Sequence, residues 1–355
     1  MSTKVAINGF GRIGRRFLRR VVRGDTGIDV VAINSNRLNP DLAAHLLKYD
    51  SVFGRFPGKV TSTDEHLIVN GRHIRVLSEA TPAGCPWGDL GVDVVVEATG
   101  VFTNADMARQ HLDSGARKVV VTAPASGADN TLIMGVNEAT YRPETDHVIS
   151  ASSCTTNCLC PLLLVLDHEF GVKSGLLTTI HAFTRDQELL DGTHPDPRRA
   201  RAATLNMCPT STGSAKAVDG IFPHLAGRVV GIAVRIPLPD VSLVDLSLVL
   251  KDKASISEVN AAFERSAGGK LAGILDVTDE PLVSSDFHGD EHSAIVDLPS
   301  TREAPDGLLK VLAWYDNEAA YAARVVDLVK TIEAVASAEV LRRQPALSGS
   351  GTPGY

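Results

Sequence analysis

The stretch that decides the fold lies near the start of the chain: 5-VAINGFGRIG-14. A short apolar run leads into three glycines, Gly9, Gly11 and Gly14, and a segment of helical character follows. Glycines at this spacing permit a tight turn and let a pyrophosphate approach the backbone at the start of a helix. Between a strand and a helix, the pattern predicts a Rossmann dinucleotide-binding domain, with an unrelated Gly-rich loop as the alternative.

The first half of the chain continues the alternation of strands and helices that this motif begins. Further apolar, β-branched runs occupy residues 29–34, 92–100 and 118–125. Strands that are apolar throughout are typical of a parallel sheet covered on both faces. Their alternation with helical segments predicts right-handed βαβ units, and therefore an α/β fold.

The second half has a different pattern, in which longer strands follow one another. These strands are predicted at 175–183, 228–238 and 241–250, with a helix at 261–273. Such an order is typical of a mixed or mainly antiparallel sheet in an α+β domain. A periodic apolar segment at about 318–338 predicts a last helix that packs back on the first domain.

The division into domains follows from these two patterns. Residues 1–152 and 318–338 are expected to form the dinucleotide-binding domain, and residues 153–317 the catalytic domain. The Gly/Ser/Pro-rich end, residues 339–355, is expected to be a flexible tail.

Composition and charge narrow the classes of partner. The chain has 355 residues, of which 44% are apolar and 22% charged, as expected for a globular protein of more than one domain. Its formal net charge of −7 provides no general attraction to nucleic acid or to a membrane surface. No apolar run approaches the roughly 20 residues that cross a bilayer. We therefore expect neither nucleic acid nor membrane as a partner, and interpret a local arginine cluster as the solvated face of a helix: Arg15, Arg16, Arg19, Arg20 and Arg23.

The cysteine content favours a reduced protein. Five cysteines, an odd number, stand in a sequence that opens without a signal-peptide pattern. A cytoplasmic protein is therefore expected rather than a disulfide-linked one. The spacing of Cys154 and Cys158 lacks the second pair of ligands that a structural zinc site needs, so no metal is expected.

Cys154 stands where a polar turn meets an apolar helix, in the stretch 150-SASSCTTNCLCPLLLV-165. Ser153 can cap that helix, and a helix N-terminus favours a thiolate, although a free cysteine often only fills a core. A nucleophilic thiol needs a base or a cation beside it. His181, at the end of the predicted strand 175–183, offers one, although a histidine at such a place is more often a core residue.

Residues suited to binding phosphate follow the histidine. The stretch 209-PTSTGSAKA-217 supplies hydroxyls and backbone N–H groups, and Arg235 supplies positive charge. A cofactor fold, a thiol at a helix start and a histidine on a strand favour catalysis together more strongly than any one of them alone.

The dinucleotide motif lacks its usual acidic residue. An Asp or Glu normally ends the second strand and binds the adenosine ribose, but here the strand ends Ile33-Asn34-Ser35-Asn36-Arg37. A carboxylate there repels a 2′-phosphate, so its loss predicts tolerance of NADP, or a preference for it. Arg37 can pair with such a phosphate; an arginine in a solvated loop is the alternative.

These motifs together resemble those of phosphorylating glyceraldehyde-3-phosphate dehydrogenases over nearly the whole chain: INGFGRIG, SCTTNC, PTSTGSAKA and WYDNEAAYAARVVDL. The resemblance implies oxidation of glyceraldehyde 3-phosphate to 1,3-bisphosphoglycerate with NAD or NADP and inorganic phosphate. The reaction would pass through a hemithioacetal and a thioester on Cys154. The resemblance also implies a homotetramer in which an S-shaped loop, residues 186–207, lies at a subunit interface near the cofactor pocket.

The resemblance further implies roles for individual residues. Cys154 would be the nucleophile, and His181 would activate it and later act as acid and base. Asn317 would fix the nicotinamide amide, and the predicted cofactor contacts as a whole are Gly9, Gly11, Arg12, Ile13, Gly14, Asn34, Arg37, Thr99, Thr122, Asn317 and Tyr321. The substrate phosphate would contact Thr184 and Arg235. The attacking phosphate would contact Ser153, Thr155, Thr212 and Gly213, with Arg199 nearby.

Three departures from the family pattern stand near these residues. Ala151-Ser152-Ser153 precedes the thiol where relatives usually have Asn-Ala-Ser, and Ala80 stands where they often have an arginine. Ala319 and Ala320 replace an aromatic residue and a glycine. No catalytic group is lost, so activity is still expected. The departures suggest the hypothesis of a specialised second copy, altered in cofactor preference or in sensitivity to a cysteine-directed inhibitor.

Three other interpretations account for parts of these motifs. The stretches HLLKYD, THPDPRRARAA and EHSAIVD also resemble erythrose-4-phosphate dehydrogenases, but that family departs from the intact Ser211-Thr212-Gly213. A non-catalytic redox sensor or binding protein on the same fold is a second alternative. A semialdehyde dehydrogenase also pairs a cysteine with a histidine, but it does not account for PTSTGSAKA together with WYDNE.

Overall fold

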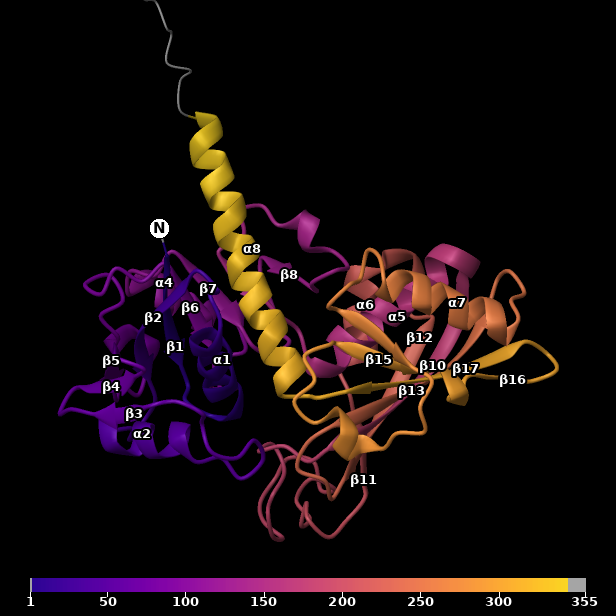
Figure 1. The fold of residues 1–355 in the computed structure, drawn as a ribbon, viewed down its shortest axis with the longest axis horizontal. Helices are drawn as coiled ribbons and strands as arrows, with labels where there is room; N and C mark the ends of the chain where they lie inside the picture. The colour runs from indigo at the N-terminus through magenta and orange to yellow at the C-terminus, as the bar shows by residue number, and fades with distance from the viewer. Residues whose placement is uncertain (1, 344–355) are drawn as a thin grey trace, which may run out of the picture.

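Two domains, each built on a sheet, lie side by side in the computed structural model, which describes residues 2–343 (Figure 1). The long helix α8 (Ala319–Arg343) runs between them and packs against α1 (Arg12–Arg23) of the first domain. Within residues 2–343 no helix, α8 included, combines the length and the apolarity that a membrane span requires.

The first sheet is parallel except at one edge. Its strand order is β3-β4-β5-β2-β1-β6-β7-β9-β8, so that β1 is central and pairs in parallel with β2 and β6. Only β3 and β4 run antiparallel to their neighbours, at the edge. The strands are β1 Thr3–Asn8, β2 Ile28–Asn34, β3 Val60–Ser62, β4 His66–Val69, β5 Arg72–Leu77, β6 Val94–Glu97, β7 Lys118–Val121, β8 Asn130–Thr131 and β9 Val148–Ser150.

Helices cover this sheet because its strands are apolar on both faces. Val5 and Ile7 of β1 have no exposed surface, and neither have Phe17 and Leu18 of α1, which pack in the same core. Val325 of α8 belongs to that core as well. This confirms the predicted α/β dinucleotide-binding fold; the other helices of this part are α2 (Pro40–Lys48), α3 (Ala105–Ala108) and α4 (Gln110–Asp113).

The second sheet is mixed, as the sequence predicted. Its order is β11-β12-β10-β13-β17-β15-β14, with β16 paired to β17. The pairs β10–β12 and β14–β15 are parallel and the others antiparallel. The strands are β10 Val172–Ala182, β11 Cys208–Ser211, β12 Val229–Ile236, β13 Ser242–Leu250, β14 Leu275–Thr278, β15 Ala294–Asp297, β16 Arg302–Glu303 and β17 Leu308–Tyr315.

Helix α5 (Cys154–Phe170) crosses this sheet and positions the thiol. Leu159 and Leu163 are fully buried in the second core, against strand residues such as Leu246 and against Phe263 of α7 (Ile256–Ala267). Only residues 151–153 separate β9 from α5. The helix therefore begins where the two domains meet. The remaining helix of this domain is α6 (Ser214–Ile221).

Two predicted helices have different bounds in the structure. The helix predicted at 261–273 runs from Ile256 to Ala267, because Ser255 and Glu258 form a capping box at its start and glycines follow its end. The last helix continues to Arg343, so residues 339–343, predicted as tail, are helical. The rest of the predicted tail, residues 344–355, lies outside the described residues.

The prediction that the arginines of α1 form a solvated face was wrong for Arg16 and Arg19. Arg19 is 1% exposed and donates to the carbonyl oxygens of Leu47, at 2.6 Å, and Gly54, at 3.2 Å. Arg16 is also buried, with its guanidinium over the Phe53 ring. Helical spacing does not distinguish a solvated basic face from one that packs against a loop and satisfies its carbonyl groups, because both place arginines three and four residues apart.

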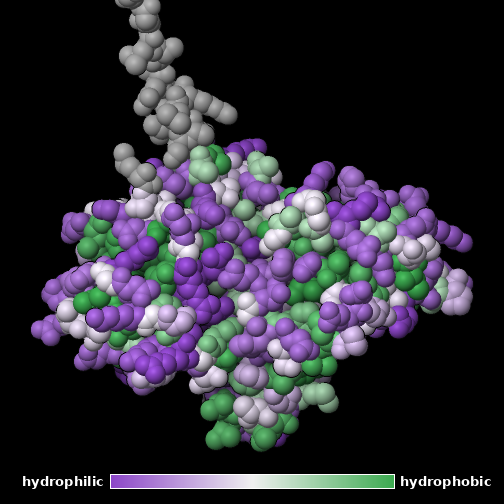
Figure 2. Space-filling view, viewed as in Figure 1, coloured by the Kyte–Doolittle hydropathy of each residue, from purple (hydrophilic) through white to green (hydrophobic). Residues whose placement is uncertain are grey.

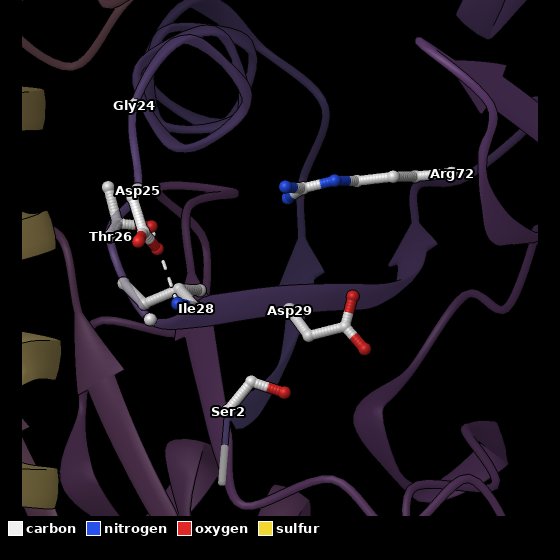
Figure 3. A pocket seen from close by; sticks show the side chains of 8 residues that line it. Ser2, Gly24, Asp25, Thr26, Ile28, Asp29 and Arg72 are labelled. Carbon is white, nitrogen blue, oxygen red and sulfur yellow. Dashed lines mark hydrogen bonds between the residues drawn. The ribbon is translucent and has the colours of Figure 1, made fainter.

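A pocket also opens at the amino ends of β1, β2 and β5, where Asp29 and Arg72 face it from neighbouring strands (Figure 3). Ser2 and Thr26 add hydroxyl groups, and Thr26 accepts a hydrogen bond from the Ile28 N–H. Cofactors bind outside the carboxyl ends of strands in open α/β sheets. This pocket therefore lies at the opposite ends of the strands from the place where a cofactor is expected.

We predict that alanine destabilises the protein at one glycine of the opening motif and not at another. A Cβ on Gly14 would lie 2.1 Å from the Gly9 carbonyl oxygen and 3.0 Å from Ile7 Cγ2, whereas one on Gly11 would meet nothing within 4 Å. Gly14→Ala should lower the free energy of unfolding by about 1–3 kcal/mol, because backbone must shift. Urea unfolding of the ligand-free protein measures this, with Gly11→Ala as the matched control. Equal unfolding midpoints for the two variants would contradict the close packing.

Candidate active site

The first turn of α5 holds Cys154 at a capped helix N-terminus. Ser153 has extended backbone angles, and its Oγ accepts a hydrogen bond of 3.1 Å from the Thr156 N–H. Cys154 follows as the first helical residue and is half-buried. Its thiol therefore lies among the free N–H groups and the positive end of the helix dipole.

The backbone just before the thiol is strained and supported from α8. Ser152 has φ 56°, in the left-handed region that non-glycine residues rarely adopt. Its carbonyl oxygen accepts from the Tyr321 hydroxyl at 2.8 Å, and its N–H donates to Ser150 Oγ at 3.0 Å. Tyr321, a predicted cofactor contact, is thus buried against the turn that presents Cys154.

His181 meets the thiol from the end of β10. Its Nε2 lies 3.3 Å from Cys154 Sγ, and its Nδ1 lies 2.7 Å from the Ala182 carbonyl oxygen. In the neutral tautomer whose proton is on Nδ1 and is donated to this carbonyl, Nε2 is free to accept the thiol proton. The structure brings the two predicted catalytic residues together in the geometry of a nucleophile and its base.

Arg235 adds positive charge beside this pair. The parallel pairing of β10 with β12 places it directly opposite His181, and its Nη1 lies 2.7 Å from His181 Nδ1 and 3.0 Å from the Ala182 oxygen. Burial, and then the Arg235 charge, lower the pKa of His181 to about 3. A protonated imidazole is therefore costly in the absence of a nearby anion.

Burial also opposes the thiolate that the sequence predicted from the helix N-terminus alone. It raises the pKa of Cys154, while the Arg235 charge and the Thr155 hydroxyl lower it in part. Moving the proton from sulfur to Nε2 creates two opposite charges 3.3 Å apart, and their attraction offsets much of the cost of burying each one. The thiolate therefore depends on its imidazolium partner.

Two helix N-termini converge beside the thiol. Ser153 Oγ, at the start of α5, lies 3.0 Å from Ser214 Oγ, at the start of α6. Thr212 Oγ1 accepts from the Ser214 N–H at 3.2 Å, and Gly213, the N-cap of α6, is exposed. Such an arrangement of free N–H groups and hydroxyls suits an anion such as phosphate.

The remaining predicted phosphate residues are placed less uniformly. Arg199 donates from Nε to Thr210 Oγ1 at 2.9 Å and pairs with Asp186, so its guanidinium is already engaged. Thr184 is half-buried, two residues beyond the end of β10. Thr155 is buried, and its hydroxyl lies 2.8 Å from the Tyr315 hydroxyl. The Thr155 hydroxyl thus makes an internal hydrogen bond, and the contact of Thr155 with phosphate stays a prediction.

The glycine motif forms the turn that a pyrophosphate needs. Gly9 has φ 101°, and a Cβ there would lie 2.6 Å from the Ala98 carbonyl carbon. The space in front of Gly11 is open, so a pyrophosphate can approach the backbone at that point. Arg12 and Ile13 begin α1, and their N–H groups belong to the free donors of its first turn. The residues present therefore fit a dinucleotide.

The Arg12 side chain does not extend freely toward this turn. Its Nε and Nη2 donate to the Glu318 carboxylate at 2.6–3.0 Å, and its Nη1 donates to Asp50 at 2.6 Å. A contact of Arg12 with a pyrophosphate must therefore use its backbone N–H. The sequence motif did not indicate these two acidic partners.

The carboxyl ends of β6 and β7 carry Thr99 and Thr122 along the same edge as the glycines. Thr99 donates to the Glu97 carboxylate, and Thr122 Oγ1 donates to the Glu97 carbonyl oxygen at 3.0 Å. The buried Glu97 side chain also accepts from Asn8, while His111 Nε2 lies 3.0 Å away. This network of buried hydrogen bonds holds Thr99 and Thr122 in place at the strand ends. No sequence motif indicated it.

Asn34 and Arg37 differ from each other in exposure. Asn34 is 3% exposed; its Nδ2 donates to Asn8 and to the Glu79 carbonyl, and its Oδ1 accepts from the Glu79 N–H. Its side chain is thus hydrogen-bonded within the protein, and its contact with a cofactor stays a prediction. Arg37 is exposed, with φ 61°, in the turn that follows Ser35.

Asn317 projects from the junction of β17 and α8 beside an acidic pair that sequence reasoning missed. Its Oδ1 accepts from Ser242 Oγ at 2.8 Å. The neighbouring Asp316 is fully buried, and burial together with the Asp316 and Glu318 charges raises the pKa of Asp240 to about 9. Within residues 2–343 no three His, Cys, Asp or Glu side chains gather as a metal site.

Comparison with known proteins adds an independent observation. Residues 3–105 match the family model "Glyceraldehyde 3-phosphate dehydrogenase, NAD binding domain", and residues 153–317 match "Glyceraldehyde 3-phosphate dehydrogenase, C-terminal domain". The chain is 52% identical over 338 residues to glyceraldehyde-3-phosphate dehydrogenase of Mycobacterium avium, covering 94% of this chain and 99% of that protein. It is 48% identical over 334 residues to glyceraldehyde-3-phosphate dehydrogenase 2 of Bacillus subtilis, covering 94% and 98%.

We predict that the ionisation of Cys154 depends on His181. In His181→Ala only burial and the nearby donors act on the thiol, so its apparent pKa should rise and alkylation by iodoacetamide at pH 7 should slow about tenfold for each unit of that rise. The measurement is the alkylation rate between pH 5 and pH 10. His168→Ala, at the exposed far end of α5, is the control. An unchanged pH profile in His181→Ala would mean that the helix N-terminus ionises the thiol alone.

Proposed function

The chain belongs to the glyceraldehyde-3-phosphate dehydrogenase family, and from this premise we propose that it oxidises and phosphorylates glyceraldehyde 3-phosphate with NAD. The observation that carries the proposal is the 3.3 Å contact between Cys154 Sγ and His181 Nε2, beside two converging helix N-termini. When bound, NAD supplies the hydride acceptor; Gly9, Gly11, Gly14, Thr99, Thr122 and Asn317 are the residues proposed to hold it.

In the first half of the reaction His181 Nε2 accepts the thiol proton while Cys154 Sγ bonds to the aldehyde carbon. The oxygen that becomes negative is proposed to receive hydrogen bonds from the Cys154 N–H and from His181. His181 returns that proton to the oxygen, which gives the hemithioacetal, and takes it back as hydride leaves the hemithioacetal carbon. The product is a thioester on Cys154, which keeps the acyl group activated.

In the second half inorganic phosphate attacks the thioester carbonyl, the C–S bond breaks and the acyl phosphate leaves. Donors at the starts of α5 and α6, namely Ser153, Thr212 and Gly213, are proposed to bind the attacking phosphate. Arg235 and Thr184 are proposed for the phosphate of the substrate. The positive charge that opposes protonation of His181 also favours the anionic substrates that this chemistry needs.

We also propose a homotetramer whose subunits meet through the loop of residues 186–207. Four large apolar side chains of this loop are between 66% and 76% exposed: Leu189, Leu190, Leu205 and Met207. Apolar surface gathers on the lower lobe of the molecule, next to β11 (Figures 1 and 2). An apolar cluster of this kind on a loop is typical of a surface that another subunit covers. A cytoplasmic location remains a prediction from the cysteine content.

The phosphate requirement and the thiol test the proposed reaction. NADH formation from glyceraldehyde 3-phosphate should require inorganic phosphate, and Cys154→Ser should lower kcat/KM at least about 10³-fold, because a hydroxyl is far less ionised than a thiol. Cys158→Ala removes the buried thiol one turn further along α5 and is the control. Steady-state kinetics measure both effects. Phosphate-independent turnover would favour erythrose-4-phosphate oxidation, and undiminished aldehyde-dependent NADH formation by Cys154→Ser would favour a non-catalytic role for the thiol.

We further propose that NADP is accepted in place of NAD. Ser35 follows the end of β2 where an acidic residue usually binds the ribose, the Asn34 side chain is bonded internally, and Arg37 is exposed on the same turn. The carboxylate that normally ends the second strand and repels a 2′-phosphate is therefore replaced here by uncharged residues.

We predict that the wild-type enzyme turns over NADP and that Ser35→Asp selects against it. The introduced carboxylate should lower kcat/KM with NADP at least about tenfold through repulsion of the 2′-phosphate, while kcat/KM with NAD is kept. Asn36→Asp, one residue further along the same turn, tests whether position matters. Failure to detect NADP turnover by the wild type at saturating concentration would contradict the proposal.

A further inference from the structure

The turn that enters β13 is strained at a buried position. Val241 has φ 64°, in the left-handed region that a β-branched residue adopts very rarely. It is 2% exposed and packs with Phe287 and Ile295, which hold it in place. Backbone strain of this kind persists only where the surroundings enforce it, and it is concentrated near functional sites. The residue placed by this strain is Ser242, the first of β13.

Ser242 makes two hydrogen bonds with opposite requirements. Its Oγ accepts from the Ala182 N–H at 3.1 Å and lies 2.8 Å from Asn317 Oδ1, and the side chain is 2% exposed. A hydroxyl has one hydrogen, and the Ala182 N–H can only donate. The Ser242 hydrogen is therefore available to Asn317, and Asn317 Oδ1 accepts it.

This contact determines which end of the Asn317 amide faces the cofactor side. Oδ1 is held by Ser242, so Nδ2, with its two hydrogens, points away from Ser242 and is left to donate. The backbone of Asn317 is fixed separately. Asp316 Oδ1 accepts from the N–H groups of Glu318, at 2.9 Å, and Ala319, at 2.6 Å. Loss of Ser242 would therefore free the orientation of the amide without moving its backbone.

We propose that Ser242 is a positioning residue that holds Asn317 as a hydrogen-bond donor, and thereby makes the site selective for the substituent on the pyridine ring of the cofactor. This inference rests on the proposed function, because it takes Asn317 as the residue that meets the nicotinamide carboxamide. Ser242 acts through Asn317 and touches neither substrate nor thiol.

The same hydroxyl joins the cofactor side of the site to the catalytic side. Ala182, whose N–H it accepts, carries the carbonyl that orients His181 Nδ1, and His181 Nε2 meets the thiol. The Asn317 amide and the His181 imidazole are thus both positioned by contacts with the end of β10. Only the Asn317 amide depends on Ser242 for its orientation, because His181 is held by the Ala182 carbonyl.

A cofactor analogue separates positioning from general structural support. In 3-acetylpyridine adenine dinucleotide a methyl group replaces the amide NH₂, so its side group accepts hydrogen bonds but donates none. When Ser242 is absent, Asn317 can turn and present Oδ1. The nicotinamide carboxamide can then turn as well and donate its NH₂ to that oxygen, whereas the acetyl group leaves it without a donor.

The experiment compares binding of NAD and of this analogue to the wild-type enzyme, Ser242→Ala and Ser247→Ala by titration calorimetry. Ser247→Ala removes a half-buried hydroxyl from the same strand, away from Asn317, and is the matched control. We expect Ser242→Ala to raise the Kd of the analogue about tenfold while that of NAD rises about twofold or less. The alkylation rate of Cys154 in the absence of cofactor should remain at the wild-type value.

Two outcomes overturn the inference. An equal rise of both dissociation constants would make Ser242 only a structural residue, and unchanged constants would show that Asn317 keeps its orientation without it. Binding is measured independently of turnover. An enzyme that binds NAD with the expected selectivity but does not oxidise glyceraldehyde 3-phosphate would therefore refute the proposed function and leave the inference standing.

Discussion

The site depends on a buried hydroxyl that joins its two halves. Tyr315 Oη lies 2.8 Å from Thr155 Oγ1, next to the thiol, and 2.9 Å from Thr179 Oγ1, two residues before the histidine on β10. These contacts attach the N-terminus of α5 to the strand that ends at His181. Burial of apolar side chains in the second core stabilises the packing of the helix on the sheet. The hydrogen bonds between these hydroxyls then specify the position of the helix relative to the strand.

Electrostatics at the site is a balance between burial and charge placement. Burial disfavours both the thiolate and the imidazolium, and Arg235 favours the first while opposing the second. The neutral pair is therefore favoured in the ligand-free site, and an arriving anion or a developing negative charge favours the imidazolium. The positive potential of the site also favours binding of two phosphate groups. Its low exposure to water strengthens these interactions, because water competes with the protein for hydrogen bonds to phosphate.

Polar contacts cross the boundary between the domains. The Arg12 guanidinium connects Glu318, at the start of α8, with Asp50, on a loop of the first domain. From the same end of α8, Tyr321 reaches the strained carbonyl of Ser152. The segment from residue 316 to residue 321 thus contacts the cofactor turn, the nucleophile turn and, through Asn317, Ser242 of the second sheet. Substitutions in residues 316–321 are therefore expected to affect the cofactor turn, the nucleophile turn and Ser242.

The sequence by itself determined the local features: the glycine turn between β1 and α1, the cap at Ser153, the parallel and mixed sheets, and the identity of the thiol and its histidine. Each depends on residues close together in the chain or on the period of apolar residues. Only the tertiary structure decided that Arg16 and Arg19 are buried, that Asn34 turns inward and that Ser242 orients Asn317. The partners in those contacts are distant in sequence, up to 75 residues for Ser242 and Asn317. A buried polar group needs a hydrogen-bond partner, but the sequence around it does not indicate which distant residue that partner is.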